Sequence, residues 1–172
     1  MTFNPVGDTK ALKPGDLLLF FDARGTNRLI TFVTKSPIYH VAISLGGEHI
    51  VEARPNGVQR NALSTRKGGE VFTWAPAPGT SDEAERATKW ALSQLGAKYD
   101  APGAVAMVLD RAFIHLHVNR VIGDRFTCGE FVALAYRHAG RILFPEIEPE
   151  DVEPADFAAF LQDGVPSSPP ER

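Results

Sequence analysis

The residue best suited to chemistry is Cys128, the only cysteine among the 172 residues. It follows Thr127 in the stretch Thr-Cys-Gly-Glu130, where the Thr127 hydroxyl and the Glu130 carboxylate can each accept a hydrogen bond from the other's backbone amide, the capping box of a helix start. Unpaired amides and the positive end of the helix dipole favour a thiolate over a thiol. The pattern predicts a nucleophile, although a free cysteine is more often a small buried apolar residue.

A cysteine nucleophile needs a base, and His40 is the best candidate among the five histidines. His40 opens the expected strand His40 to Leu45 just after a Ser36-Pro37 turn, so its side chain is held by rigid backbone. The remaining histidines are better explained by structure. They lie at a hairpin end (His49), on one amphipathic segment (His115 and His117) and on the outer part of the Cys128 helix (His138). His115 and His117 point to different faces of a helix and predict no metal pair.

Glu52 is the candidate for the third group, which would orient His40. It is a carboxylate inside the apolar run Ile-Val-Glu-Ala53, on the strand that a Gly46-Gly47 hairpin pairs with the strand of His40. Register decides whether the two side chains share a face. Pairing Leu45 with Glu48 would send Glu52 to the other face, whereas pairing Ser44 with Glu48 places His40 directly opposite Glu52. The functional interpretation requires the second register, and the alternative is a solvent-facing Glu52.

The elements that must position these residues predict an α+β fold, with a small antiparallel sheet in the first half of the chain packed against later helices. Continuous apolar or alternating runs bounded by turn residues favour strands at residues 17–21, 38–45, 49–53, 57–60 and 70–74. Capped, periodic segments favour helices after Thr80, over 101–118, from Cys128 and over 156–161, with a weak helical pattern over 27–35.

Composition limits the class of protein. The formal charge is -3 and the basic residues are interspersed with acidic ones, which argues against a nucleic-acid partner. One cysteine excludes an intramolecular disulfide. We expect one domain over residues 1–164 and a disordered Pro-rich tail over 165–172. No signal peptide or membrane-spanning run is visible, which predicts a cytoplasmic protein by default and leaves the compartment and oligomeric state open.

Taken together, these segments resemble a known family. Residues 13–20 (Lys-Pro-Gly-Asp-Leu-Leu-Leu-Phe), 36–46 (Ser-Pro-Ile-Tyr-His-Val-Ala-Ile-Ser-Leu-Gly), 50–53 and 126–132 (Phe-Thr-Cys-Gly-Glu-Phe-Val) are similar to the NlpC/P60 papain-like superfamily. The histidine strand precedes the cysteine helix here, as in the circularly permuted YiiX-like and lecithin:retinol acyltransferase-like branch. The order and joint presence of the segments carry the resemblance, which covers most of the chain.

The resemblance implies Cys128 as nucleophile, His40 as general base and Glu52 as the orienting residue. Residues 96–100 (Gly-Ala-Lys-Tyr-Asp) are similar to a Gly-x-x-Tyr segment of ordinary members, which implies that Tyr99 lines a substrate site. Gly129 departs from the family pattern, in which serine usually follows the cysteine.

The expected chemistry is acyl transfer, in which His40 takes the thiol proton, Cys128 attacks a carbonyl and a helix-start amide holds the oxyanion. We expect no metal or organic cofactor. The substrate is a peptide or related amide, such as cell-wall material, or else a lipid ester or amide, for which residues 101–118 would form an apolar wall. A catalytically silent binding module of the same fold is the third hypothesis.

Overall fold

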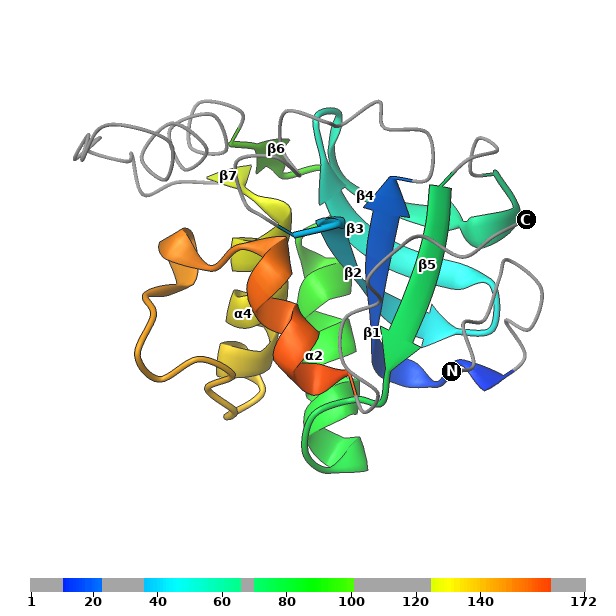
Figure 1. Ribbon diagram of the computed structural model, residues 1–172. Helices are drawn as coiled ribbons and strands as arrows, with labels where there is room; N and C mark the ends of the chain where they lie inside the picture. The colour runs from blue at the N-terminus through cyan, green and yellow to red at the C-terminus, as the bar shows by residue number, and fades with distance from the viewer. Residues whose placement is uncertain (1–10, 23–35, 66–69, 101–124, 162–172) are drawn as a thin grey trace, which may run out of the picture.

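The computed structural model describes residues 11–22, 36–65, 70–100 and 125–161, and Figure 1 shows a sheet with helices on one face. The sheet strands are β1 (Pro14–Asp22), β2 (Ile38–Gly46), β3 (His49–Arg54), β4 (Gly57–Ala62) and β5 (Glu70–Ala75). Their order is β4-β3-β2-β1-β5, and every neighbouring pair is antiparallel. The α+β class and the small antiparallel sheet predicted from the sequence are confirmed.

Within the described residues, two α-helices pack on the sheet: α2 (Ser81–Ser93) and α4 (Cys128–His138). Both begin at the predicted capping boxes, with Thr80 and Thr127 as N-caps. Two further strands, β6 (Lys98–Tyr99) and β7 (Arg125–Phe126), form a parallel pair that the sequence did not indicate, because two-residue strands carry no periodic signal.

The short segments are 3₁₀ turns: η2 (Leu63–Thr65), η3 (Pro149–Asp151) and η4 (Pro154–Phe160). The helix expected over 156–161 is corrected to the 3₁₀ segment η4, which starts two residues earlier. Pro154 fits in its first turn, because a backbone N–H at that position has no acceptor within the helix and its absence in proline costs nothing. The segments expected over 27–35 and 101–118, and the tail over 165–172, lie outside the described residues.

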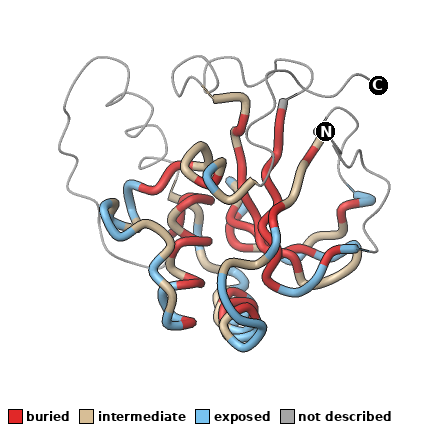
Figure 2. Tube along the Cα trace, turned by 60° about the horizontal axis from the view of Figure 1, so that its bottom comes forward, coloured by how far each residue is buried: buried red, intermediate tan, exposed pale blue. Residues whose placement is uncertain are grey.

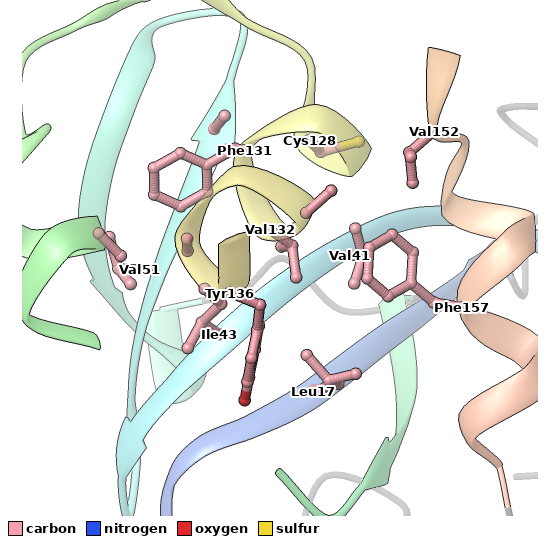
Figure 3. Packing of buried hydrophobic residues seen from close by; sticks show 14 of the residues in the cluster. Leu17, Val41, Ile43, Val51, Cys128, Phe131, Val132, Tyr136, Val152 and Phe157 are labelled. Carbon is pink, nitrogen blue, oxygen red and sulfur yellow. The ribbon is translucent and has the colours of Figure 1, made fainter. Parts of the chain in front are cut away.

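Both faces of the sheet carry buried residues; α2 buries one side, whereas α4 is buried over most of its length and is exposed only at its last two residues (Figure 2). Odd-numbered residues of β1 point toward α2 and α4, whereas Leu18 and Phe20 belong to a second apolar cluster on the opposite face. Within α4, Phe131, Val132 and Tyr136 are fully buried and fix the helix on the sheet. Each such side chain contributes about 1.5–3 kcal/mol through burial, so the position of Cys128 at the start of α4 is set by the core (Figure 3).

None of the helices in the described part of the chain has the length and apolar character needed to cross a bilayer.

Candidate active site

Cys128 occupies the first residue of α4, where the capping box is complete. The Thr127 hydroxyl accepts from the Glu130 amide at 3.2 Å, and the Glu130 carboxylate accepts from the Thr127 amide at 3.2 Å. Cys128 is 6% exposed, and Figure 3 shows its sulfur directed away from the α4 axis, toward the side where Val152 lies. As the first helical residue, Cys128 has a backbone amide with no acceptor inside the helix.

The start of α4 faces a place where β2 and β3 separate. Their pairing runs from Gly46↔His49 to Ile43↔Val51, and over the remaining described residues of the two strands no further pairs form. The backbone of β2 before Ile43 therefore does not pair with β3. The Val41 amide on this part of β2 lies near the Cys128 sulfur and helps to lower the pKa of the thiol.

His40 lies in this separated part of β2 and is 6% exposed. Its ring sits beside Phe20, with 5.4 Å between ring centroids, and beside Tyr39 at 6.3 Å. The imidazole lies close enough to Cys128 for the two side chains to shift each other's pKa. His40 and Cys128 therefore influence each other electrostatically, and the hydrogen bond between them stays a prediction.

Glu52 supplies the second partner of the imidazole. Its Oε2 lies 2.6 Å from His40 Nε2, and its side chain is fully buried. Since Nε2 faces the carboxylate, Nδ1 is the ring nitrogen left for the thiol. The predicted contact between Glu52 and His40 is confirmed.

The register that we used to predict this contact was wrong. The hairpin turn is Gly47-Glu48 between Gly46 and His49, followed by a bulge that leads to the pair Ser44↔Ile50. If this register is continued along the two strands, Glu52 lies opposite Ala42, which is two residues away from His40 on β2. The bulge adds one residue to β2 and thereby keeps both side chains on one face, so they meet diagonally.

The charges of the pair favour the thiolate. Burial raises the pKa of the Cys128 thiol, but the charge of His40, its hydrogen bond and the amides of Val41 and Gly129 outweigh burial, so that pKa is lowered. Burial lowers the pKa of His40, but the charge and hydrogen bond of Cys128 and those of Glu52 raise it overall. The two shifts together favour a thiolate beside an imidazolium.

Gly129 fills a place where a side chain has no room. A Cβ at this position would overlap the carbonyl oxygen of Val152, because the backbone before η4 crosses directly over the first turn of α4. The close approach of this backbone therefore gives a local steric reason for a glycine at position 129.

Tyr99 on β6 lies close enough to Cys128 for the charge of the thiol to act on it. Burial raises the pKa of Tyr99 above its usual range, the charges of Cys128 and Asp100 add to that effect, and Arg54 opposes it. The phenol therefore stays protonated over the working pH range. That Tyr99 lines a substrate site stays a prediction.

Two neighbours of Glu52 were missed by sequence reasoning. Asn61 Nδ2 donates to Glu52 Oε1 at 2.9 Å, and Arg54 Nη1 lies 4.0 Å from the same oxygen. Asn61 belongs to β4 and Arg54 ends β3, so only the strand register reveals that they converge.

The histidines not assigned to the site lie elsewhere or outside the described residues. His49 is exposed at the start of β3, and the His138 ring stacks on Trp90 with 4.7 Å between centroids. His115 and His117 fall outside the described residues. Among the residues that the structure describes, no three His, Cys, Asp or Glu side chains gather as a metal site would require.

Comparison with protein-family models gave no match to this chain, and comparison with curated proteins gave no significant relative.

Proposed function

We propose that the protein is a cysteine hydrolase that cleaves an amide bond through an acyl-enzyme, on a circularly permuted papain-like fold. The observation that carries the proposal is the buried series from Cys128 through His40 to Glu52. Nucleophile, base and orienting carboxylate come from three different elements and meet where two strands separate. This is the arrangement that covalent catalysis by a thiol needs.

The first half of the reaction forms a thioester. The Cys128 thiolate adds to the substrate carbonyl, and the Cys128 amide, free of any intrahelical acceptor, donates to the oxyanion. As the C–N bond breaks, the imidazolium Nδ1 of His40 gives its proton to the leaving nitrogen. Glu52 holds the ring through Nε2 during this transfer.

The second half releases the acyl group. Neutral His40 takes a proton from water, the hydroxide equivalent adds to the thioester carbonyl, and the C–S bond breaks. The products are a carboxylic acid, the Cys128 thiolate and the His40 imidazolium, so the resting pair is restored. No electrons are exchanged with an outside group.

The raised pKa of His40 favours an amide over an ester as substrate. An amine is a poor leaving group and needs a proton as the C–N bond breaks, whereas an alkoxide departs with less help. The raised pKa of His40 favours the imidazolium, which can supply this proton. The resemblance to NlpC/P60 peptidases points to a peptide amide, such as one in cell-wall material.

The experiment is acyl-enzyme trapping with a panel of short peptide amides and, in parallel, lipid esters and amides in micelles. Mass spectrometry of the quenched protein is expected to show an acyl adduct on Cys128 from a peptide amide, and Cys128→Ala is the matched control without adduct. Adducts from lipids alone would replace the amidase with the lipid-directed acyltransferase or lipase. Absence of any adduct, with thiol reactivity like that of a simple thiol, would support the binding module.

A further inference from the structure

Asn61 is a candidate for a fourth member of the hydrogen-bonded series, and the strand register shows why. It stands opposite Ile50, and Glu52 stands opposite Gln59, so Asn61 is diagonal to Glu52 across β3 and β4. His40 is diagonal to Glu52 on the other side, across β2 and β3. The Glu52 carboxylate therefore lies between His40 on β2 and Asn61 on β4, and each of its two oxygens faces one of these side chains.

The contacts divide the two oxygens of the carboxylate. Oε2 accepts from His40 at 2.6 Å, and Oε1 accepts from Asn61 at 2.9 Å. Arg54 lies 4.0 Å from Oε1, beyond hydrogen-bonding distance, and its side chain is one-third exposed. Asn61 therefore makes a short, directional contact with Oε1.

Because Glu52 is fully buried, the hydrogen bond from Asn61 affects the charge and the orientation of its carboxylate. A fully buried carboxylate tends to take up a proton or to turn toward whatever donor is near, unless its oxygens are held by hydrogen bonds. An amide N–H on Oε1 favours the ionised form and prevents rotation of the carboxylate about its last torsion. Both effects keep the negative charge on the His40 side.

We propose that Asn61 is a positioning residue that keeps the Glu52 carboxylate charged and aimed at His40, and through His40 maintains the Cys128 thiolate. The inference rests on the proposed function, because it assigns a part of the same site. It adds a residue from an edge strand of the sheet, remote from Cys128 in the sequence, to the groups that control the thiol.

The test measures the rate of Cys128 alkylation by iodoacetamide from pH 5 to 10, a readout that requires no substrate. Asn61→Leu removes the donor at similar volume and is expected to shift the thiolate titration upward, lowering the rate near neutral pH about tenfold for one unit of pKa. Gln59→Leu is the matched control, since Gln59 is the cross-strand partner of Glu52 while the hydrogen bond comes from Asn61. The control is expected to leave the profile unchanged.

A double substitution separates positioning from general loosening of the fold. If Asn61 acts through Glu52, adding Asn61→Leu to Glu52→Gln produces no further shift, because the charge that Asn61 holds is already gone. A shift as large as in the wild-type background overturns the inference. Circular dichroism reports folding, and Asn61→Ala is read in the same way if Asn61→Leu does not fold.

The outcomes also separate this inference from the proposed function. If the wild-type thiol titrates at low pH and Asn61→Leu leaves the alkylation profile unchanged, the role of Asn61 is overturned and the hydrolase proposal stands. An ordinary thiol titration in the wild-type protein overturns both.

Discussion

The helices α2 and α4 begin with the same local structure and differ in what surrounds it. Each has a Thr-x-x-Glu capping box, with Thr80 and Glu83 in one and Thr127 and Glu130 in the other. In α2 the box lies at the surface, where Arg141 pairs with Glu83 at 3.1 Å. In α4 the Thr127 cap is 3% exposed.

The first helical residue is an exposed Ser81 in α2 and the buried Cys128 in α4. Both positions offer free amides and the same dipole, yet only Cys128 has an imidazole and a strand amide aimed at its side chain. From this comparison we infer that a helix start positions a side chain near free amides, whereas the groups on the separated strands β2 and β3 lower the pKa of the Cys128 thiol.

Removing the nucleophile gives the largest expected effect. We expect Cys128→Ala to lower turnover of the amide substrate roughly 10⁴-fold or more, as loss of a covalent nucleophile does in enzymes that depend on one. Ser81→Ala, at the same helical position of α2, is expected to change nothing measurable. Steady-state kinetics with both purified variants makes the comparison, and substantial turnover by Cys128→Ala contradicts the mechanism.

Neutralising the orienting carboxylate comes next. Cys128 is the larger cause of the raised pKa of His40 and Glu52 adds to it; Glu52→Gln keeps the shape but removes the charge of Glu52, so the pKa of His40 is expected to fall and the pKa of Cys128 to rise. We expect kcat to drop roughly 10²- to 10⁴-fold, the range associated with a disturbed histidine partner. A pH profile of kcat/KM records both limbs. The rate is lost as pH falls through the pKa of Cys128 and as pH rises through the pKa of His40, and in this variant the two limbs move toward each other.

The second helical residue differs between the helices and gives a stability test. Gly129→Ala forces a Cβ against the carbonyl of Val152, and we expect about 2–3 kcal/mol of destabilisation from this overpacking. Asp82→Ala in α2 removes only an exposed carboxylate near a helix start, worth about 0.3–1 kcal/mol. Urea denaturation measures both. Equal losses would mean that the segment before η4 does not hold α4 as described.

The caps themselves give the smallest effect. We expect Thr80→Ala to cost about 1 kcal/mol and Thr127→Ala about 2 kcal/mol, because Thr127 is buried and its hydrogen bond to the Glu130 amide is partly shielded from water, whereas Thr80 is exposed. The same denaturation experiment compares them. A larger loss for Thr80→Ala would reverse the assignment of the buried and exposed boxes.

Much of the fold could be predicted because its signals are local. Capping boxes set the starts of α2 and α4, and apolar runs between turn residues marked β1 to β5. The parallel pair β6 and β7 could not be foreseen, since it consists of two residues on each strand and depends on tertiary contacts. η4 was placed nearly correctly but assigned to the wrong helix type.

The members of the candidate site could be selected from the sequence, whereas their geometry could not. Residue type and position were enough to select Cys128, His40 and Glu52, whereas the bulge after Gly46 changed the expected register and made their meeting diagonal. Asn61 carried no signal of its own, because an asparagine on a short edge strand has many ordinary roles. The separation of β2 and β3, which frees the Val41 amide, is a property of the sheet that no single segment encodes.

The central claim is that surroundings, and not the helix start alone, activate the thiol. The most direct measurement compares the alkylation profiles of two proteins from pH 5 to 10: the wild type, and the double variant Cys128→Ala/Ser81→Cys, which carries its only thiol at the exposed start of α2. We predict that the Cys128 titration midpoint lies below the ordinary value of about 8.5 and well below that of the transplanted thiol, which stays within about one unit of the ordinary value. A Cys128 midpoint equal to or above that of the transplanted thiol would contradict the account.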